Sequence, residues 1–208
     1  MYKKISKILG VAIILAGLAG LAFGDDTTTK LISASISAED GLEVTISKIN
    51  ANGTGDPSDD TWIPGNQSSM AFGALTFNPT YSIFMASHYF AIDVGVNSNT
   101  ANWTLSHTIS SISNGAGSNL DSNVNVTFVQ QLDSLTEGWK NGYSFADSNG
   151  KAYNKATITG GSGGWLRIYY GIATGDLVYH DNTGVSVITM EKPSGSYSGS
   201  ITLTLTAS

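Results

Sequence analysis

The chain has 208 residues, of which 41% are hydrophobic and only 12% are charged, a composition typical of a globular protein and not of a disordered one. Ten Lys and Arg stand against sixteen Asp and Glu, so the formal net charge is −6. Because nucleic-acid binding needs clustered cations, nucleic acid is excluded as an expected partner. The sequence has no cysteine, so disulfides and zinc–thiolate sites are excluded too, and stability must come from core burial, bound ions or assembly.

The first 24 residues have the pattern of a secretory signal peptide. Three lysines precede an uncharged apolar stretch, residues 8–23, that ends in small residues at Gly24. A membrane anchor is the alternative, but the apolar run is shorter than the roughly 20 residues that a spanning helix needs. We therefore expect cleavage after Gly24 and a secreted product, either extracellular or on the cell surface. Removing residues 1–24 takes away three lysines and no acidic residue, which leaves 184 residues with a formal charge of −9.

Residues 30–38 alternate between apolar and polar side chains, which is the period of a β-strand. Serines occupy one phase, and the apolar phase consists of Ile32, Ala34, Ile36 and Ala38. Asp40 and Gly41 follow, a pair typical of tight turns, and a second alternating segment covers residues 42–46. This connection predicts either a hairpin or a strand that switches partners.

Residues 50–69 are rich in Gly, Pro and Asp, which predicts a long surface loop. Three carboxylates lie in this loop: Asp56, Asp59 and Asp60. Calcium prefers several such oxygen ligands at flexible spacing, so a calcium site is one interpretation, and a solvated acidic loop is the other. No other cofactor is expected.

Further segments show strand alternation at residues 88–96, 103–109, 124–128, 165–172, 185–187 and 201–205. A short helical turn is expected only within residues 130–140. About ten to twelve short strands separated by turns predict an all-β fold, a sandwich or barrel of Greek-key type. There is no repeat and no interdomain linker, so residues 41–208 are expected to form one domain after an extension of residues 25–40.

No local motif predicts an enzyme. His88, His107 and His180 lie apart in the sequence, and the HExxH, GxSxG and P-loop patterns are absent. His88 and His107 fall in the apolar phase of their strands, so they either share a site or are hydrogen-bonded core residues. An active site assembled from distant acidic residues would leave no motif and stays a third hypothesis.

The segment 165–172 has aliphatic residues in one phase and Trp165, Arg167 and Tyr169 in the other. Aromatic rings on an open sheet face can stack on sugars, so these three residues are a candidate glycan platform. If a second sheet covers them, they are core residues instead.

Both ends of the chain have the features of strand-pairing surfaces. The C-terminal segment, residues 193–208, has a glycine–tyrosine–glycine turn followed by alternating aliphatic and hydroxyl residues: Gly195, Tyr197, Gly199, Ile201, Leu203 and Leu205. Near the other end, KLISASISAED (residues 30–40) precedes LEVTISKINANG (residues 42–53), and AFGALTFNPT covers residues 71–80. These segments resemble secreted pilin and coat-type subunits, in particular the cysteine-free colonisation-factor class of chaperone–usher pilins.

The resemblance implies an immunoglobulin-like sandwich that lacks one strand and is completed by the N-terminal strand of the next subunit. In this donor-strand exchange, Ile32, Ala34 and Ile36 would be the inserted side chains, and the strand with Ile201, Leu203 and Leu205 would receive them. Copies of the same chain, and a secretion chaperone, would be the partners. An exposed strand edge invites such pairing, and a head-to-tail contact that does not close gives a filament. Residues 30–38 could equally pair within their own subunit.

The sequence therefore predicts a non-enzymatic structural subunit of an extracellular filament or surface layer. The alternative is a secreted β-sandwich that binds carbohydrate or acts as an adhesin, with a glycan or a host cell surface as its partner. The first hypothesis predicts stable polymers, and the second predicts binding that depends on the aromatic platform.

Overall fold

The computed structural model describes residues 40–52, 59–63, 65–98, 100, 102–130, 142–154, 164–175 and 184–207. The chain divides into two units, Met1–Ala38 and Glu39–Ser208, and all described residues belong to the second. The expected leader, the expected strand at residues 30–38 and nearly all of the expected helical turn at residues 130–140 lie outside the described residues.

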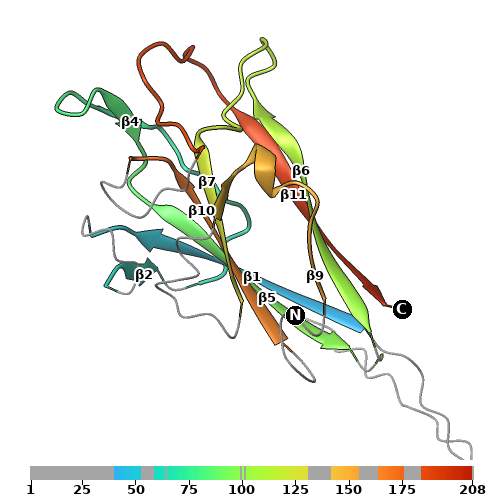
Figure 1. The fold of residues 1–208 in the computed structure, drawn as a ribbon. Coiled ribbons are helices and arrows are strands. Elements are labelled where there is room, and N and C mark those ends of the chain that lie inside the picture. Colours follow the sequence, from blue (N-terminus) through green and yellow to red (C-terminus); the bar gives the residue numbers. More distant parts are fainter. Residues whose placement is uncertain are drawn as a thin grey trace, which may run out of the picture. The chain divides into compact units, whose positions relative to one another are not determined.

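Two antiparallel sheets make up most of the described part, which confirms the all-β prediction (Figure 1). The larger has the order β2-β1-β5-β10-β7-β8, with bounds β1 Asp40–Asn50, β2 Thr61–Ile63, β5 Tyr89–Ser98, β7 Val124–Gln130, β8 Gly142–Ser144 and β10 Gly164–Ile172. The smaller has the order β11-β6-β9, with bounds β6 Trp103–Ser113, β9 Lys151–Asn154 and β11 Ser198–Ala207. A hairpin joins β3 (Thr76–Asn78) to β4 (Ile83–Met85), and a short 3-10 helix, η1 (Ala146–Ser148), precedes β9.

β5 lies inside the larger sheet and shows why its sequence forms a strand. It pairs with β1 along one edge and with β10 along the other. Ile92, Val94 and Val96 on one face are buried, whereas Asp93 and Gly95 on the opposite face are partly exposed. The alternation in the sequence therefore separates a core face from an outer face.

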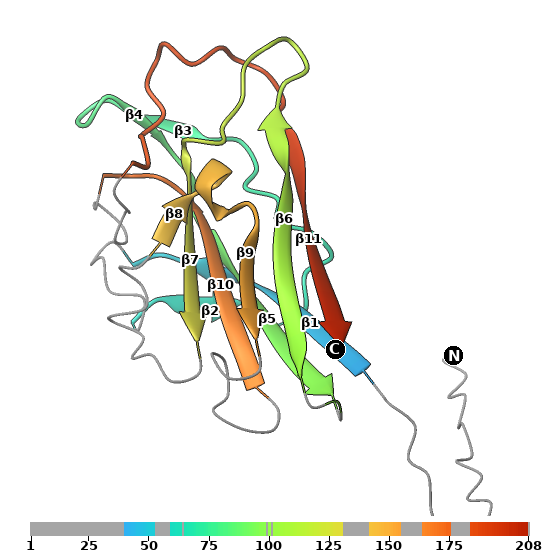
Figure 2. The same cartoon turned by 45° about the vertical axis from the view of Figure 1, so that its right-hand side comes forward.

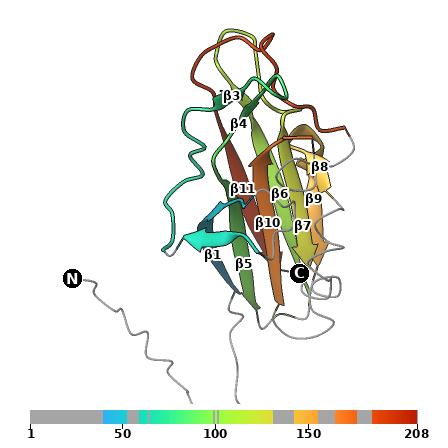
Figure 3. The same cartoon turned by 90° about the vertical axis from the view of Figure 1, so that its left-hand side faces the viewer.

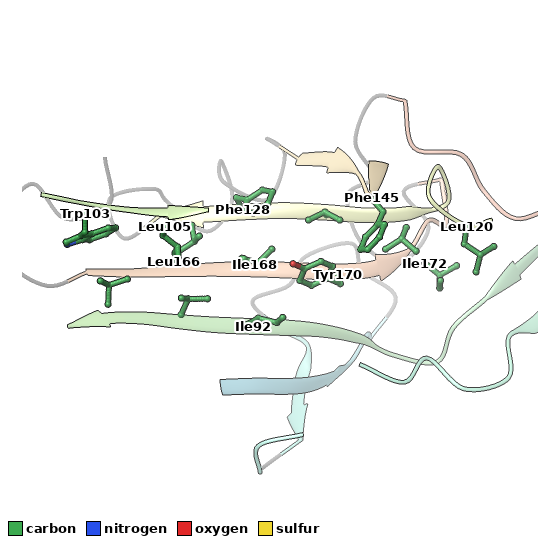
Figure 4. Close-up of a cluster of buried hydrophobic side chains, with 14 of the residues drawn as sticks. Ile92, Trp103, Leu105, Leu120, Phe128, Phe145, Leu166, Ile168, Tyr170 and Ile172 are labelled. Carbon is green, nitrogen blue, oxygen red and sulfur yellow. The ribbon is translucent and has the colours of Figure 1, made fainter. Parts of the chain in front are cut away.

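The hydrophobic core lies between the two sheets. Figure 4 shows Leu166, Ile168, Tyr170 and Ile172 following one another along β10. The smaller sheet contributes Trp103 and Leu105 of β6, both 1% exposed, and the other buried members are Ile92, Val94, Val96, Leu120, Val124, Val126, Phe128, Phe145 and Ile188. The smaller sheet therefore covers one face of the larger sheet (Figure 2).

The strands run between two ends of the described part. We call the end at which the chain enters β1 the entry end, and the opposite end the tip. At the entry end β1 begins beside the end of β5, and β6 begins beside the end of β11. The tip, at the opposite end, carries the β3–β4 hairpin and the segments 114–123 and 184–197 (Figure 3). The N–H of Phe84 in β4 donates to the carbonyl of Ile188 at 2.8 Å, which holds the hairpin to the last of these segments.

Asp40 and Gly41 do not form the hairpin turn that was one of the two expectations. Both belong to β1, where Asp40 lies opposite Ser98 and Gly41 opposite Asn97. A two-residue Asp-Gly turn needs positive φ at both central residues, and Gly41 is not among the glycines with positive φ. The hairpin prediction is wrong because pairing with β5 keeps this stretch extended.

Two further expectations need correction. The segment 50–69 is not all loop, because Thr61-Trp62-Ile63 pairs as β2 with the end of β1, and β-branched and aromatic residues suit a strand. Val185 and Val187 do not form a strand, since only the next residue, Ile188, makes an isolated bridge. An alternation of two residues is too short to specify a ladder.

Candidate functional site

The outer edge of β11 is the longest strand edge without a neighbour in the described part of the chain. β11 pairs only with β6, where Ile201 lies opposite Ile109 and Leu203 opposite His107. On β6, the N–H of Ile109 donates to Oδ1 of Asn149, and the carbonyl of His107 accepts from the N–H of Gly150. Both partners lie in the turn that precedes β9, so these two backbone groups of β6 point away from β11. Since backbone groups alternate along an antiparallel strand, the free edge of β11 presents the N–H and C=O groups of Ile201, Leu203 and Leu205.

The same three residues carry the inward-facing side chains of β11. They are half buried and pack against the core. On the larger sheet, Val44 of β1 lies opposite Val94, which is fully buried, yet Val44 itself is 37% exposed. An apolar side chain that faces the core and still meets solvent indicates that the core is incompletely covered beside β1.

The described segments that lie along the outer edge of β1 cover its half nearer the tip. β2 pairs with Lys48–Asn50, and the N–H of Ile46 donates to Asn66 Oδ1 at 2.8 Å while its carbonyl accepts from the N–H of Gln67 at 2.8 Å. Phe72 continues this cover by packing edge-on against Phe90 of β5. No described segment pairs with residues 40–45 on this edge.

β1 and β11 approach each other on this side of the molecule but share no ladder (Figure 2). We call the side bounded by residues 40–45 of β1 and by β11 the open side. It presents two strand edges and a strip of aliphatic side chains: Leu42, Ile201, Leu203 and Leu205, which are half buried, and Val44, which is exposed.

A tyrosine-containing turn leads into β11. The hydroxyl of Tyr197 donates to the carbonyl of Pro193 at 2.6 Å and lies 3.2 Å from the hydroxyl of Ser118. A bulge between Ser198 and Ser200 then shifts the register of β11 against β6. The turn and the bulge together fix the point at which the open edge begins.

Replacing Gly199 in this bulge by Ala should lower the free energy of unfolding by about 1–3 kcal/mol, the range of overpacking. A Cβ there would lie 2.8 Å from the carbonyl oxygen of Ser110 and 2.9 Å from Cα of Ile112, and backbone atoms cannot move aside easily. Gly95→Ala is the matched control, because its Cβ would make an ordinary contact 3.7 Å from Cβ of Glu43. Urea unfolding should show no loss in the control, and equal losses in both variants would contradict this account.

The outer face of the larger sheet carries the candidate glycan platform. Arg167 holds both carboxylate oxygens of Asp93, at 2.5 and 2.9 Å, and its guanidinium lies 4.6 Å from the ring centroid of Trp62. Burial opposes the charge on Arg167, but the hydrogen bonds to Asp93 outweigh it and raise the pKa of Arg167. Tyr169 is 4% exposed, and burial raises its pKa as well.

The three predicted platform residues do not form one open aromatic surface among the described side chains. Tyr169 lies in a buried cluster with Ile49, Tyr89 and Val129, so its ring offers no open face. Arg167 is engaged by Asp93, and the side chain of Trp165 lies outside the described residues. Among the described side chains of this region, Trp62 is an aromatic residue that meets solvent, 37% exposed.

The predicted calcium loop has a structural role at Asp60. Its carboxylate is buried and accepts from the hydroxyl of Tyr89 at 2.6 Å and from the N–H of Asn52 at 2.7 Å. Burial and this hydrogen bond raise the pKa of Tyr89. Asp59 is exposed, and Asp56 lies outside the described residues. Over the described ranges, no three His, Cys, Asp or Glu side chains converge into a group that could hold a metal.

The two candidate histidines are not brought together. His88 bonds the hydroxyl of Ser87 and the carbonyl of Ala71, each at 3.0 Å. His107 lies 1% exposed between the sheets, where Nδ1 is 3.0 Å from the carbonyl of Ser148 and Nε2 is 2.8 Å from the hydroxyl of Tyr170. Each histidine thus has its own partners, as in the core interpretation.

Sequence reasoning did not single out Trp62 or Asp93. Asp93 was detectable in principle, because it lies in the phase opposite to the apolar residues of its strand and so must face outward, as Arg167 does on its own strand. That these two residues meet depends on the register between β5 and β10, which places them directly opposite each other. Trp62 gave no signal, because β2 is only three residues long.

No helix among the described residues is both long and apolar enough to cross a membrane. In comparisons with known proteins, no family model, no curated protein and no solved structure is significantly similar to this chain.

Proposed function

We propose that the mature chain is a non-enzymatic structural subunit of an extracellular filament. It would be an immunoglobulin-like sandwich in which the open side receives residues 30–38 of another copy. The observation that carries the proposal is the free edge of β11, whose backbone groups and half-buried aliphatic side chains belong to the same three residues, Ile201, Leu203 and Leu205. An edge of this kind gains main-chain hydrogen bonds and apolar contacts when a strand is added.

The segment 30–38 has the chemistry that this edge requires. Its apolar residues recur every second position, as do those of β11, so one strand can place Ile32, Ala34 and Ile36 opposite the three aliphatic residues of β11. Its other phase is serine, which can face solvent. No charged residue lies between Ile32 and Ala38 that would have to be buried.

The course of β1 favours exchange between copies over folding back. For residues 30–38 to lie against their own β1 in a tight hairpin, the chain would have to reverse next to Asp40. Asp40 and Gly41 are extended and paired with β5, so the turn would have to consume Glu39 and the residues before it. Those residues begin with Ala38, which belongs to the apolar phase.

A filament also fixes the direction of the added strand. β1 starts at the entry end, so the chain that leads from the donor strand must join the donor's described part at that end. If residue 38 also entered its acceptor at the entry end, two entry ends would face each other and the contact would not propagate. Entry at the tip lets every copy point the same way, and the added strand then runs antiparallel to β11, the more stable pairing.

The purified mature chain, residues 25–208, tests the proposal. It should form polymers that resist heat and denaturant and appear as filaments by electron microscopy. Deleting residues 25–38 should leave monomers, because the donor strand is lost while the described strands remain. A monodisperse monomer of the undeleted chain, with unfolding independent of protein concentration, would overturn the proposal.

A further inference from the structure

The two most exposed large apolar side chains among the described residues both lie at the tip. Tyr81 is 54% exposed and Met190 is 73% exposed. Tyr81 lies in the β3–β4 turn, and Met190 lies in the segment 184–197. Phe84 and Ile188 form an antiparallel bridge; Tyr81 precedes Phe84 by three residues, and Met190 follows Ile188 by two. The bridge therefore brings the two apolar side chains out from neighbouring stretches of backbone.

The turn that carries Tyr81 is held in a defined shape. Asn78 Oδ1 accepts from the N–H of Thr80 at 3.0 Å and from the N–H of Tyr81 at 3.4 Å. Ser82 has a φ of 57°, the left-handed conformation, which residues other than glycine adopt only when their surroundings impose it. The hairpin thus holds the ring of Tyr81 in solvent on a turn of defined shape.

The length of the chain between donor strand and β1 limits how far apart two copies can lie. If the donor strand extends to Ala38, only Glu39 separates it from Asp40, where β1 begins. Two residues span about 7 Å when fully extended. The entry end of the donor copy must then contact the tip of the acceptor, because the chain that links the donor strand to β1 is no longer than this.

The residues exposed at the entry end suit an apolar contact. Gly41, Asn97, Asn102 and Ala207 are exposed, small or uncharged, and come from β1, β5, the start of β6 and β11. An aromatic ring and a thioether can pack on these four residues, none of which carries a charge. In the proposed head-to-tail filament, these four residues face the tip of the neighbouring copy.

We propose that Tyr81 and Met190 form the contact surface on which the entry end of the next copy sits, so that each junction combines an inserted strand with an apolar tip contact. This inference rests on the proposed function, which supplies the second copy as occupant. The tip contact would orient successive copies, and the inserted strand would hold them together.

Cysteine cross-linking tests this arrangement, because the chain has no cysteine of its own. Met190→Cys at the tip and Asn102→Cys at the entry end, in one mature chain, should give a ladder of covalent multimers when its polymers react with a short bismaleimide. Thr108→Cys with Asn102→Cys is the matched control, since Thr108 is exposed on the outer face of β6 and should give no ladder. In a separate variant, Tyr81→Glu with Met190→Glu should lower the association constant of each junction about tenfold, which corresponds to a loss of roughly 1.4 kcal/mol per junction.

The outcomes separate this inference from the proposed function. Polymers that form normally but give no ladder overturn the tip contact and leave strand exchange standing. Glutamate variants that polymerise like the parent but no longer attach to cells would assign the tip to an external surface and also overturn the inference. If the parent chain forms no polymer, the proposed function fails and the tip contact fails with it.

Discussion

Ala34→Asp in the mature chain should abolish its polymers. In the proposed pairing Ala34 lies at the centre of the donor strand, opposite Leu203 of the acceptor, and its side chain faces the half-buried aliphatic strip of the open side. A carboxylate placed there would lose water without gaining a partner, which costs several kcal/mol or forces the group to protonate. Sedimentation and electron microscopy of the variant should show monomers where the parent shows filaments.

Ser35→Asp is the matched control for this experiment. It introduces the same charge one residue away, in the phase that faces solvent in the added strand, so its polymers should resemble those of the parent. Loss of polymer in both variants would point to a general effect of charge in the segment. Retention of polymer in both would contradict the insertion of residues 30–38 into a neighbour.

The long strands of this fold could be predicted because inward-facing apolar side chains recur at every second position along them. β5, β6, β10 and β11 have nine to eleven residues, enough to repeat the two-residue period several times. The same alternation placed His107 and Tyr170 in the inward phase of their strands, and both are buried. A period of two is thus sufficient to assign faces, even without knowledge of which strands are neighbours.

The short strands and the order of the strands could not be predicted in this way. β2, β3, β4 and β8 have three residues each, too few to establish a period. Asp40 and Gly41 illustrate a second reason, because a turn-forming pair stays extended when a ten-residue ladder with β5 holds it. Local propensity is a weak force beside the sum of a long ladder's contacts.

The open side combines a predictable and an unpredictable part. The aliphatic phase of β11 and its position near the end of the chain are visible in the sequence. That its outer edge has no described neighbour depends on the sheet order β11-β6-β9, which arises from pairing between segments far apart. The ion pair between Arg167 and Asp93 likewise joins residues 74 positions apart, and no local pattern specifies it.

His107 and Tyr170 form a hydrogen-bonded bridge between the two sheets. The carbonyl of Ser148 can only accept, so Nδ1 of His107 donates to it, and Nε2 of the neutral ring accepts the hydroxyl proton of Tyr170. Burial lowers the pKa of His107, although the hydrogen bond to Ser148 opposes this, and burial raises the pKa of Tyr170 well above its usual value. Both side chains are therefore neutral in the folded chain near pH 7, as their geometry requires.

The free energy of unfolding should therefore fall as the pH is lowered below about 6.5, the usual pKa of histidine. In that range His107 binds a proton in the unfolded chain but stays neutral in the folded chain, so protonation favours unfolding. The free energy of unfolding falls by up to about 1.4 kcal/mol per pH unit until the pH reaches the lowered pKa of His107 in the folded chain. Above pH 6.5 this contribution is fully present. Urea unfolding of the mature chain between pH 5 and pH 8 measures the slope.

Two substitutions separate the titration of His107 from the hydrogen bond that it accepts. Tyr170→Phe removes the hydroxyl and leaves Nε2 of His107 buried without a donor, which should cost about 1–3 kcal/mol at pH 7 while the acidic slope persists. His107→Gln keeps a polar group near Ser148 but cannot titrate, so its contribution to the slope between pH 6.5 and pH 5 should disappear. If the slope of His107→Gln equals that of the parent, other groups carry the acid sensitivity, and the assignment to His107 is wrong.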